Sequence, residues 1–213
     1  MTPAIETILS TRLLGIIRMK KYEHPVEVAQ ALADGGIKAL EFTLSGDGAL
    51  QAIAAARVAL DWNIHIGAGT VLTPTAVSRA AEAGAEFIVT PVVNPHVIAA
   101  CRRLGLPIAC GAFTPTEIMT AVEAGADLIK LFPARLGGPQ YVRDLLAPFP
   151  DLRLMPTGGV SAENAASYLK AGAAAVAIGG SLVPAQAVAA GAFDEIVERA
   201  RLYVAAVNGM SNP

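Results

Sequence analysis

The residue most able to do chemistry in this sequence is a lysine inside an apolar segment. Lys130 stands in the run Leu128-Ile129-Lys130-Leu131-Phe132, which has the length and composition of a buried strand. Burial disfavours the charged ammonium, so the amine is neutral more often and can attack a carbonyl carbon. The other lysines lie in polar turns or at helix ends: Lys20, Lys21, Lys38 and Lys170. A packed stem with a solvated head, or a buried ion pair, would also fit the run.

Two glycine pairs late in the chain could bind a phosphate group. Gly158-Gly159 follows one predicted strand, and Gly179-Gly180-Ser181 follows the next. Glycine lets backbone N–H groups approach an anion closely, and a helix beginning at Ser181 would direct its positive end towards the anion. One glycine pair alone is usually a turn. Two pairs at the ends of consecutive strands predict an anion site.

A repeated pattern indicates the elements that position these residues. Each copy reads as a helix end, a glycine at the C′ position, a tight turn and a buried strand. Four copies are similar and the last one given is looser: residues 33–41, 81–89, 122–130, 169–177 and 103–110. Capping residues followed by proline mark helix starts: Thr73-Pro74, Asn94-Pro95 and Thr114-Pro115. Thr114 with Glu117 also fits a capping box.

The alternation of strands and helices predicts an α/β fold. Eight apolar strands separated by helical patterns favour a parallel (β/α)8 TIM barrel, with a short N-terminal helix, over an open sheet. No linker or change of composition divides the chain, so residues 1–213 are expected to form a single domain. The strands are expected near Leu14–Ile17, Ala39–Leu44, His65–Gly69, Phe87–Thr90, Ile108–Gly111, Leu128–Phe132, Leu154–Pro156 and Ala175–Ile178.

The repeat also predicts which strand residues face the barrel interior. Counting five residues past each helix-ending glycine reaches Glu41, Val89, Cys110, Lys130 and Ala177. Equivalent positions on equivalent strands should face the same way, because strand side chains alternate. Glu41 and Lys130 would then point inward near the carboxyl-terminal mouth, where barrel active sites lie. The two residues could act as acid–base group and nucleophile, or they could form a structural ion pair.

The composition of the chain limits the cellular locations and the binding partners that are expected for it. Hydrophobic residues make up 54% of the chain, but the longest uncharged stretch, 171–193, contains glycine and proline and suits a strand, loop and helix better than a membrane span. The N-terminus has no basic leader of a signal peptide. The two cysteines lie in apolar surroundings, which indicates reduced thiols and a cytoplasmic protein. The net charge is −2 without a basic stripe, so no nucleic-acid partner is expected.

With these residues, the sequence resembles the 2-keto-3-deoxy-6-phosphogluconate (KDPG) and 4-hydroxy-2-oxoglutarate (KHG) aldolase family over nearly its whole length. The order of the Gly-Ala-Gly-Thr and Lys-x-Phe-Pro pieces is the most specific part of the match. The matching pieces are Glu41-Phe42-Thr43-Leu44, Gly67-Ala68-Gly69-Thr70-Val71-Leu72, Thr90-Pro91, Thr114-Pro115-Thr116-Glu117, Lys130-Leu131-Phe132-Pro133-Ala134, Pro156-Thr157-Gly158-Gly159-Val160 and Ile178-Gly179-Gly180-Ser181.

The resemblance implies a class I aldolase that uses neither metal nor cofactor. Lys130 would form an imine with the C2 ketone of KDPG and Glu41 would move protons, with pyruvate and D-glyceraldehyde 3-phosphate as products. The same chemistry would cleave KHG to pyruvate and glyoxylate. The resemblance places Thr70 at the carboxylate, Pro91 and Phe132 along the pocket wall, and Gly158, Gly159, Gly180 and Ser181 at the phosphate, with Thr157 among the substrate-binding residues. It also implies a homotrimer.

The sequence departs from the family at one substrate contact. The gluconate-specific members usually carry an arginine after Glu-x-Thr-Leu, whereas this chain has Ser45. The related phosphogalactonate aldolases also lack this arginine and share a Gly-Pro-Gln-Tyr segment, present here at 138–141. The preferred C4 epimer therefore stays open. Arg18, at the end of the first strand, is the candidate substitute for the carboxylate anchor, and a strand-end ion pair is the alternative.

The same residues leave other functions open. A phosphosugar isomerase or epimerase, or a phosphosugar-binding regulatory barrel, would share the glycine pairs but would not need an amine in the mouth. A metal-dependent aldolase needs clustered histidine and carboxylate ligands. The histidines are scattered and are expected to be capping or surface residues: His24, His65 and His96.

Overall fold

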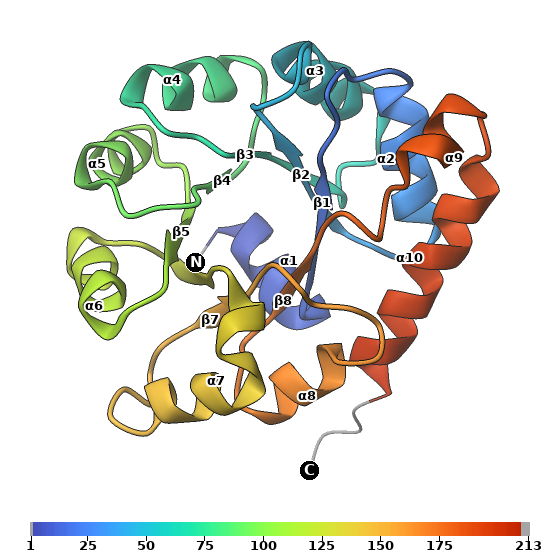
Figure 1. Ribbon diagram of the computed structural model, residues 1–213. Coiled ribbons are helices and arrows are strands. Elements are labelled where there is room, and N and C mark those ends of the chain that lie inside the picture. Colours follow the sequence, from blue (N-terminus) through green and yellow to red (C-terminus); the bar gives the residue numbers. More distant parts are fainter. Residues whose placement is uncertain (1, 210–213) are drawn as a thin grey trace.

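The computed structural model describes residues 2–209 as a ring of eight parallel strands surrounded by helices (Figure 1). The strands are hydrogen-bonded in the order β7-β6-β5-β4-β3-β2-β1-β8, and a single bridge between Thr157 and Ala177 joins the two ends. The predicted (β/α)8 TIM barrel is confirmed. The strands are β1 (Leu13–Ile17), β2 (Ala39–Thr43), β3 (His65–Gly69), β4 (Ile88–Val89), β5 (Ile108–Ala112), β6 (Leu128–Leu131), β7 (Leu154–Pro156) and β8 (Val176–Ile178).

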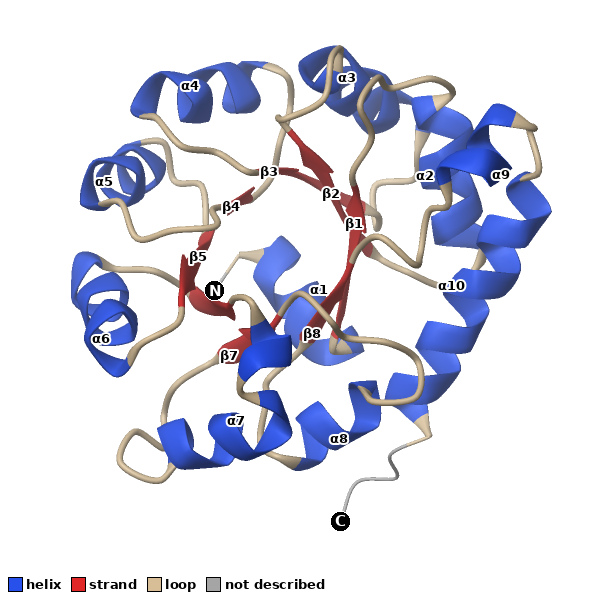
Figure 2. Ribbon diagram, viewed as in Figure 1, coloured by secondary structure: helices blue, strands red, loops and turns tan. Residues whose placement is uncertain are grey.

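Helices surround the strand ring, except for α1, which lies against one end of it (Figure 2). Their residues are α1 (Pro3–Thr11), α2 (Pro25–Asp34), α3 (Ala49–Ala59), α4 (Pro74–Glu82), α5 (Pro95–Arg103), α6 (Pro115–Ala124), the 3₁₀ turn η1 (Ala134–Leu136), α7 (Gly138–Leu146), α8 (Ala165–Lys170), α9 (Ala185–Ala189) and α10 (Phe193–Asn208). The uncharged stretch 171–193 forms a strand, loop and helix, as predicted. No helix of the described residues is long and apolar enough to cross a membrane.

Helix α1 closes the amino-terminal end of the barrel. Its buried face contributes Ala4, Ile5 and Ile8 to the core inside the ring. The other residues of this interior core lie in the strands or directly before them: Leu14, Ile16, Ala39, Phe87, Val89, Ala109, Leu128, Met155, Ala175 and Ala177. A second and larger core fills the space between the ring and the outer helices. The predicted N-terminal helix therefore packs against the interior and leaves the opposite end of the barrel for a site.

The predicted helix starts are confirmed. The side chain of Thr73 accepts a hydrogen bond from the backbone of Ala76, and that of Asn94 accepts one from His96. At α6, Thr114 and Glu117 form the full capping box. Backbone N–H groups of Thr114 and Phe113 donate to the Glu117 carboxylate and hold its pKa below the usual value. These caps fix where the helices leave the mouth of the barrel.

The predicted inward positions are correct except on β5. Val89 and Ala177 belong to the interior core, whereas Cys110 packs in the outer core and Ala109 faces inward. The inward residue Ala109 of β5 lies four positions after the helix-ending Gly105, whereas the inward residue Leu128 of β6 lies three positions after Gly125. The two counts differ by one residue. A shift of one residue reverses the facing of every side chain on a strand.

Candidate active site

A buried amine and a buried carboxyl group lie at the centre of the barrel. Lys130 is the third residue of β6 and is 1% exposed, and Glu41 is the third residue of β2 and is 0% exposed. Lys130 pairs in register with Gly111 and Met155, and Glu41 pairs with Ile16 and Gly67. The ammonium nitrogen of Lys130 lies 5.4 Å from the centre of the Phe132 ring. The structure thus brings together the two predicted catalytic residues.

Burial shifts the pKa values of both groups. Desolvation lowers the pKa of Lys130; the Glu41 carboxylate opposes this shift and Arg18 adds to it. Desolvation raises the pKa of Glu41, and the positive charges of Lys130 and Arg18 oppose that shift. The lysine therefore loses its proton more readily than in water, and the glutamic acid keeps its proton to higher pH. Such a pair can exchange protons with a bound molecule more readily than the same two groups in water.

The Glu41 carboxylate is available to a bound molecule. Neither of its oxygens has a hydrogen-bond partner among the described residues, although both are buried. Within residues 2–209, no ion pair shorter than 4.0 Å joins it to Lys130. A buried carboxylate without partners is costly in a structural role, since unmade hydrogen bonds carry the full desolvation penalty. The arrangement does not match the alternative of a structural ion pair.

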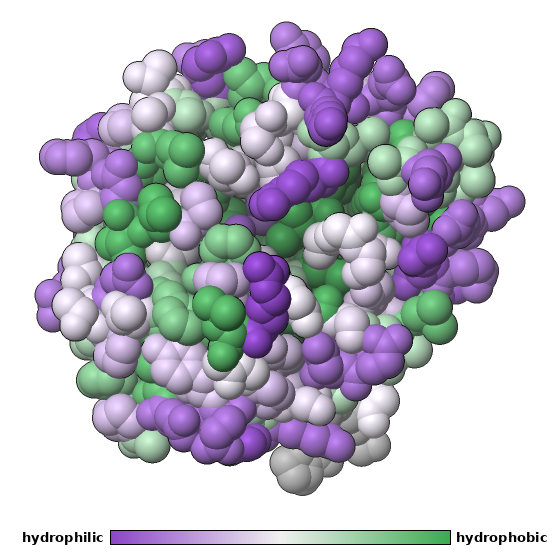
Figure 3. Space-filling view, viewed as in Figure 1, coloured by the Kyte–Doolittle hydropathy of each residue, from purple (hydrophilic) through white to green (hydrophobic). Residues whose placement is uncertain are grey.

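A cavity of about 340 Å³ opens at the carboxyl ends of the strands. Figure 3 shows a hollow near the centre of this face, with apolar residues deep inside it and hydrophilic residues at its edge. The cavity contains Arg18 and most of the predicted substrate contacts. Its lining residues are Ile16, Arg18, Phe132, Thr157, Gly158, Gly159, Val160, Ala177, Gly179, Gly180 and Ser181.

Arg18 follows β1 at the edge of this cavity, and its side chain is exposed. It forms no ion pair in the part of the chain that the structure describes, so the alternative of a strand-end ion pair is not found. Its charge acts on both Glu41 and Lys130. Ser45 is exposed after β2 and donates a hydrogen bond to the Thr43 hydroxyl at 3.2 Å.

The two glycine loops have the backbone geometry of an anion site. Gly158 and Gly159 have φ values of 86° and 87°, in the left-handed region that favours glycine. A Cβ on Gly180 would meet no atom within 4 Å. In residues 2–209, the backbone N–H groups of Gly159, Gly180 and Ser181 donate no hydrogen bond. These donors are free to meet a phosphate.

The structure corrects the expected helix start at Ser181. Residues 179–182 form a turn in which Leu182 donates to the Gly179 carbonyl at 2.7 Å, and α9 begins at Ala185. Pro184 explains the delay, since the residue before a proline is disfavoured in helical conformation. Any anion held here would rely on loop N–H groups rather than on a helix dipole.

Two predicted contacts lie outside the wall of this cavity. Thr70 follows β3 and has a left-handed φ of 56°, which is uncommon for a residue other than glycine. Pro91 follows β4 and packs so tightly on Gly111 that a Cβ there would lie 2.5 Å from the Pro91 carbonyl oxygen. Thr70 follows a strand that neighbours β2, which carries Glu41, whereas Pro91 follows β4, which lies two strands away from both β2 and β6 in the ring.

Some residues near the site carry no signal in the local sequence. The Ser181 hydroxyl shares a 2.5 Å hydrogen bond with the hydroxyl of Tyr203, which belongs to α10. Gly159 packs against Arg135, where a Cβ would lie 2.5 Å from the Arg135 Cβ. Gly69, noted only as part of a motif, lies directly against the Glu41 side chain. These contacts join segments that are distant in sequence.

The three histidines do not form a cluster in the structure. His65 is 7% exposed and its Nδ1 lies 3.0 Å from Glu86, so the expectation of a surface or capping residue is wrong for it. His24 occupies the N-cap position of α2 without a side-chain capping bond, and His96 is exposed. Among the described residues, no group of three His, Cys, Asp or Glu side chains could hold a metal ion.

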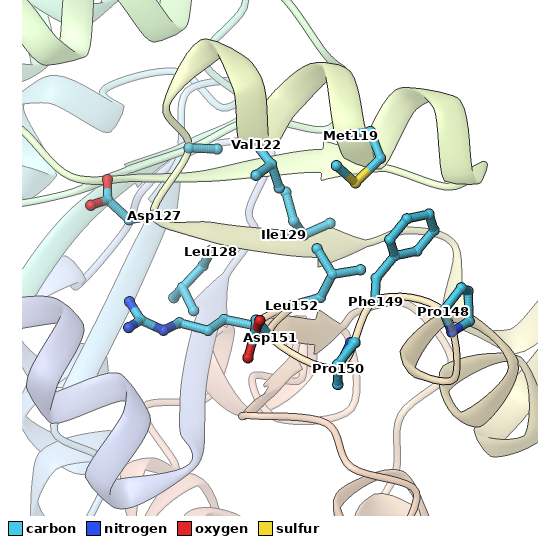
Figure 4. A pocket seen from close by; sticks show the side chains of 12 residues that line it. Met119, Val122, Asp127, Leu128, Ile129, Pro148, Phe149, Pro150, Asp151 and Leu152 are labelled. Atoms are coloured by element: carbon cyan, nitrogen blue, oxygen red, sulfur yellow. The ribbon is translucent and has the colours of Figure 1, made fainter.

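A larger hollow of about 410 Å³ lies at the amino ends of β6 and β7, on the other side of these strands from the glycine loops. Figure 4 shows Met119, Ile129, Leu152 and Phe149 converging on it. Its lining is mainly apolar and contains none of the predicted catalytic or substrate-binding residues, whereas Arg18, Phe132 and the glycine loops line the cavity at the barrel mouth. The cavity at the barrel mouth is therefore the candidate active site.

The chain is similar to known proteins over most of its length. A family model described as KDPG and KHG aldolase matches residues 5–199. The chain is 39% identical to the 2-dehydro-3-deoxy-phosphogluconate aldolase of Treponema pallidum, over 92% of this chain and 93% of that protein. It is also 39% identical to the KHG/KDPG aldolase of Escherichia coli, over 92% of each.

Solved structures agree with the sequence comparison. A KDPG aldolase from Legionella pneumophila, with pyruvate captured as a covalent carbinolamine intermediate, superposes with a TM-score of 0.87 at 28% identity, covering 94% of this chain and 97% of that one. Sequence, fold and the placement of Lys130 and Glu41 thus lead to one assignment: the chain belongs to the KDPG and KHG aldolase family.

Proposed function

We propose that this protein is a class I aldolase that cleaves 2-dehydro-3-deoxy-6-phosphogluconate to pyruvate and D-glyceraldehyde 3-phosphate. The observation that carries the proposal is the buried Lys130 amine, with its lowered pKa, across the barrel from the unpartnered Glu41 carboxylate. The names of the curated relatives support the reaction.

In the proposed reaction, the neutral amine of Lys130 adds to the C2 ketone to give a carbinolamine, which loses water to form a protonated imine. The Glu41 carboxylate takes the proton of the C4 hydroxyl. The C3–C4 bond then breaks, its electron pair moves towards the imine, and the aldehyde leaves. Protonation of the resulting enamine at C3 and hydrolysis return pyruvate and the free amine. The imine is the electron sink, so the mechanism uses no metal or cofactor.

The two ends of the substrate have different proposed contacts. The phosphate would meet the N–H groups of the glycine loops, at Thr157, Gly158, Gly159, Gly180 and Ser181. The carboxylate would meet Arg18 and Thr70, while Pro91 and Phe132 would pack beside the reacting carbons. An unphosphorylated substrate, 4-hydroxy-2-oxoglutarate, would use only the second set and yield pyruvate and glyoxylate. It is therefore expected to be cleaved with a higher KM.

The galactonate epimer is a second candidate substrate, because Ser45 stands where the gluconate-specific members carry an arginine. The hydrogen bond from Ser45 to Thr43 supports a small polar group at this place. Rates on the two purified C4 epimers decide between them. A preference of tenfold or more for the galactonate compound would replace the first assignment.

The test of the reaction is covalent trapping. The protein is incubated with pyruvate and borohydride, its intact mass is measured, and the modified peptide is mapped. The expected result is one reduced pyruvate adduct on Lys130, which Lys130→Met abolishes and the surface variant Lys170→Met leaves unchanged. No adduct, or an adduct on another lysine, would overturn the proposal and favour a phosphosugar isomerase or a phosphosugar-binding barrel.

The role of Glu41 is tested by Glu41→Gln, which keeps the shape of the side chain and removes its basicity. Acid–base groups of this kind contribute roughly 10²–10⁴-fold to a rate. Cleavage by the variant is expected to fall by about that factor, measured as kcat with a coupled assay for the aldehyde product. Cleavage at the unaltered rate would assign the proton transfer to another group.

We also propose that residues 1–213 act as one domain in a cytoplasmic homotrimer that takes a small phosphorylated 2-keto acid. A solved protein cage designed by fusing symmetric oligomeric domains is similar to this chain and supports an oligomer, and so do the exposed apolar side chains of Leu72, Val92 and Leu136. Sedimentation equilibrium would report three chains per particle. A monomer at micromolar concentration would contradict this assembly.

A further inference from the structure

The inward face of β3 has no side chains near its carboxyl end. Gly67 and Gly69 both face inward, and each would collide with a neighbour if it carried a Cβ. At Gly67 the added atom would overlap the Phe87 ring. At Gly69 it would overlap the Glu41 carboxylate and lie 2.5 Å from its Cγ. The two glycines form a recess whose first half holds Phe87 and whose second half holds Glu41.

Glycine is not required at position 69 by the backbone. The residue lies in a regular strand and its φ is outside the left-handed region. The strand is also fixed in place, because Leu44 donates to the Gly69 carbonyl at 2.7 Å and Val71 donates to the Val89 carbonyl at 3.2 Å. A methyl group at position 69 could not be accommodated by a shift of the strand. It would have to displace the Glu41 side chain.

We infer that Gly69 is a positioning residue: the space left by its missing side chain holds the Glu41 carboxylate apart from Lys130. This inference rests on the proposed function, in which Glu41 must stay free to reach the substrate. The cations that act on this carboxylate are Lys130 and Arg18. A carboxylate pushed out of the recess is drawn to one of them. Pairing with Lys130 would stabilise the ammonium and suppress attack on the ketone.

The decisive experiment is a double-mutant cycle with Gly69→Ala, Glu41→Ala and the double variant. If Gly69 acts through Glu41, Gly69→Ala lowers kcat/KM at least tenfold, and the double variant is no slower than Glu41→Ala alone. The pH midpoint of pyruvate trapping also moves upward in Gly69→Ala, which a purely structural defect would not produce. Losses that multiply across the two sites would overturn the inference.

The melting temperature provides a readout that does not depend on activity. Gly69→Ala is expected to lower Tm in the presence of Glu41 and to leave it unchanged with alanine at 41, because the methyl group then occupies the vacated recess. If Gly69→Ala alone is too unstable to purify while the double variant folds, the coupling is confirmed in its strongest form. A double variant that also fails to fold would overturn the inference that Gly69 makes room for the Glu41 side chain.

Gly105→Ala is the matched control. This glycine meets nothing within 4 Å and has a φ of +67°, so alanine should cost the same Tm with or without Glu41. The double-mutant cycle measured by Tm also distinguishes a failure of the proposed function from a failure of the inference about Gly69. If the parent protein forms no pyruvate adduct, the proposed function is wrong, yet the cycle still tests the recess. If the adduct forms but Gly69 and Glu41 are uncoupled, only the inference about Gly69 is lost.

Discussion

Burial moves the proton affinities of Lys130 and Glu41 towards each other. The lysine is displaced downward from its usual range and the glutamic acid upward, and each charge partly restores the other. The two shifts are therefore coupled, and changing one residue must move the titration of its neighbour. This coupling gives tests that are sharper than loss of activity, because the direction of each shift is known.

Trapping of pyruvate should become faster as the pH rises through the pKa of Lys130, since only the neutral amine attacks. The midpoint should lie below the value of 10.5 for an unperturbed lysine. Glu41→Gln removes a charge that raises the Lys130 pKa, so the midpoint should move to lower pH. The rate of borohydride-trapped adduct against pH, followed by mass spectrometry, measures it. Glu123→Gln, on the exposed surface of α6, is the control, and an unmoved midpoint in Glu41→Gln would contradict the coupling.

Arg18 should influence both binding and titration. Its charge lowers the Lys130 pKa, so Arg18→Ala should move the trapping midpoint to higher pH. Loss of a charged hydrogen bond of about 1.5–3 kcal/mol should raise the KM for pyruvate in the condensation direction about tenfold or more. Arg18→Lys keeps the positive charge, so its trapping midpoint should stay close to that of the parent protein. Its KM should remain raised, because lysine lacks the two-pronged geometry of arginine. An unchanged KM in Arg18→Ala would place the carboxylate anchor elsewhere.

Among the elements of the fold, the strands position the reacting groups Lys130 and Glu41, and the loops after the strands are proposed to bind the two ends of the substrate. The glycine loops after β7 and β8 differ in what holds them. Gly158 and Gly159 depend on left-handed backbone, whereas Gly180 does not and faces open space. A side chain at Gly180 would therefore disturb a ligand without disturbing the fold.

Gly180→Val should raise the KM for the phosphorylated substrate and leave the melting temperature unchanged. The added side chain meets no protein atom at its Cβ but occupies the place proposed for the phosphate. The same variant provides its own control, because cleavage of 4-hydroxy-2-oxoglutarate should change less than about threefold, while the phosphorylated substrate loses on the order of tenfold or more. Equal losses on both substrates would show that the phosphate binds elsewhere.

The sequence predicted elements better than contacts between them. Strand alternation and helix-ending glycines located the barrel, and the shared phase predicted that Glu41 and Lys130 both point inward, because these signals are local. The facing of Cys110 failed because a one-residue difference in a turn reverses a strand. The recess at Gly69 and the bond between Ser181 and Tyr203 could not be predicted, since each depends on how distant elements pack.

At the scale of the whole molecule, the two ends of the barrel have separate tasks. The carboxyl end holds the cavity, Arg18 and the glycine loops, while the amino end is closed by α1. Because the interior core continues from Ile5 and Ile8 up to Val89 and Ala177, the catalytic pair rests on a packed floor. Such a floor excludes water from below and keeps Lys130 and Glu41 in their low-dielectric setting.

Ile8→Ala tests this division of tasks. Ile8 is 0% exposed inside the ring, and truncating it should cost about 2–5 kcal/mol of unfolding free energy, through lost burial and a cavity. The measurement is urea unfolding followed by circular dichroism, with Glu6→Ala on the exposed face of α1 as a control expected within about 0.5 kcal/mol. Below the transition, kcat should change much less than stability, because the reacting groups lie at the other end of the barrel. An Ile8→Ala variant as stable as the parent protein would show that α1 does not close the barrel, and a selective loss of kcat would show that the interior core acts on the reacting groups directly.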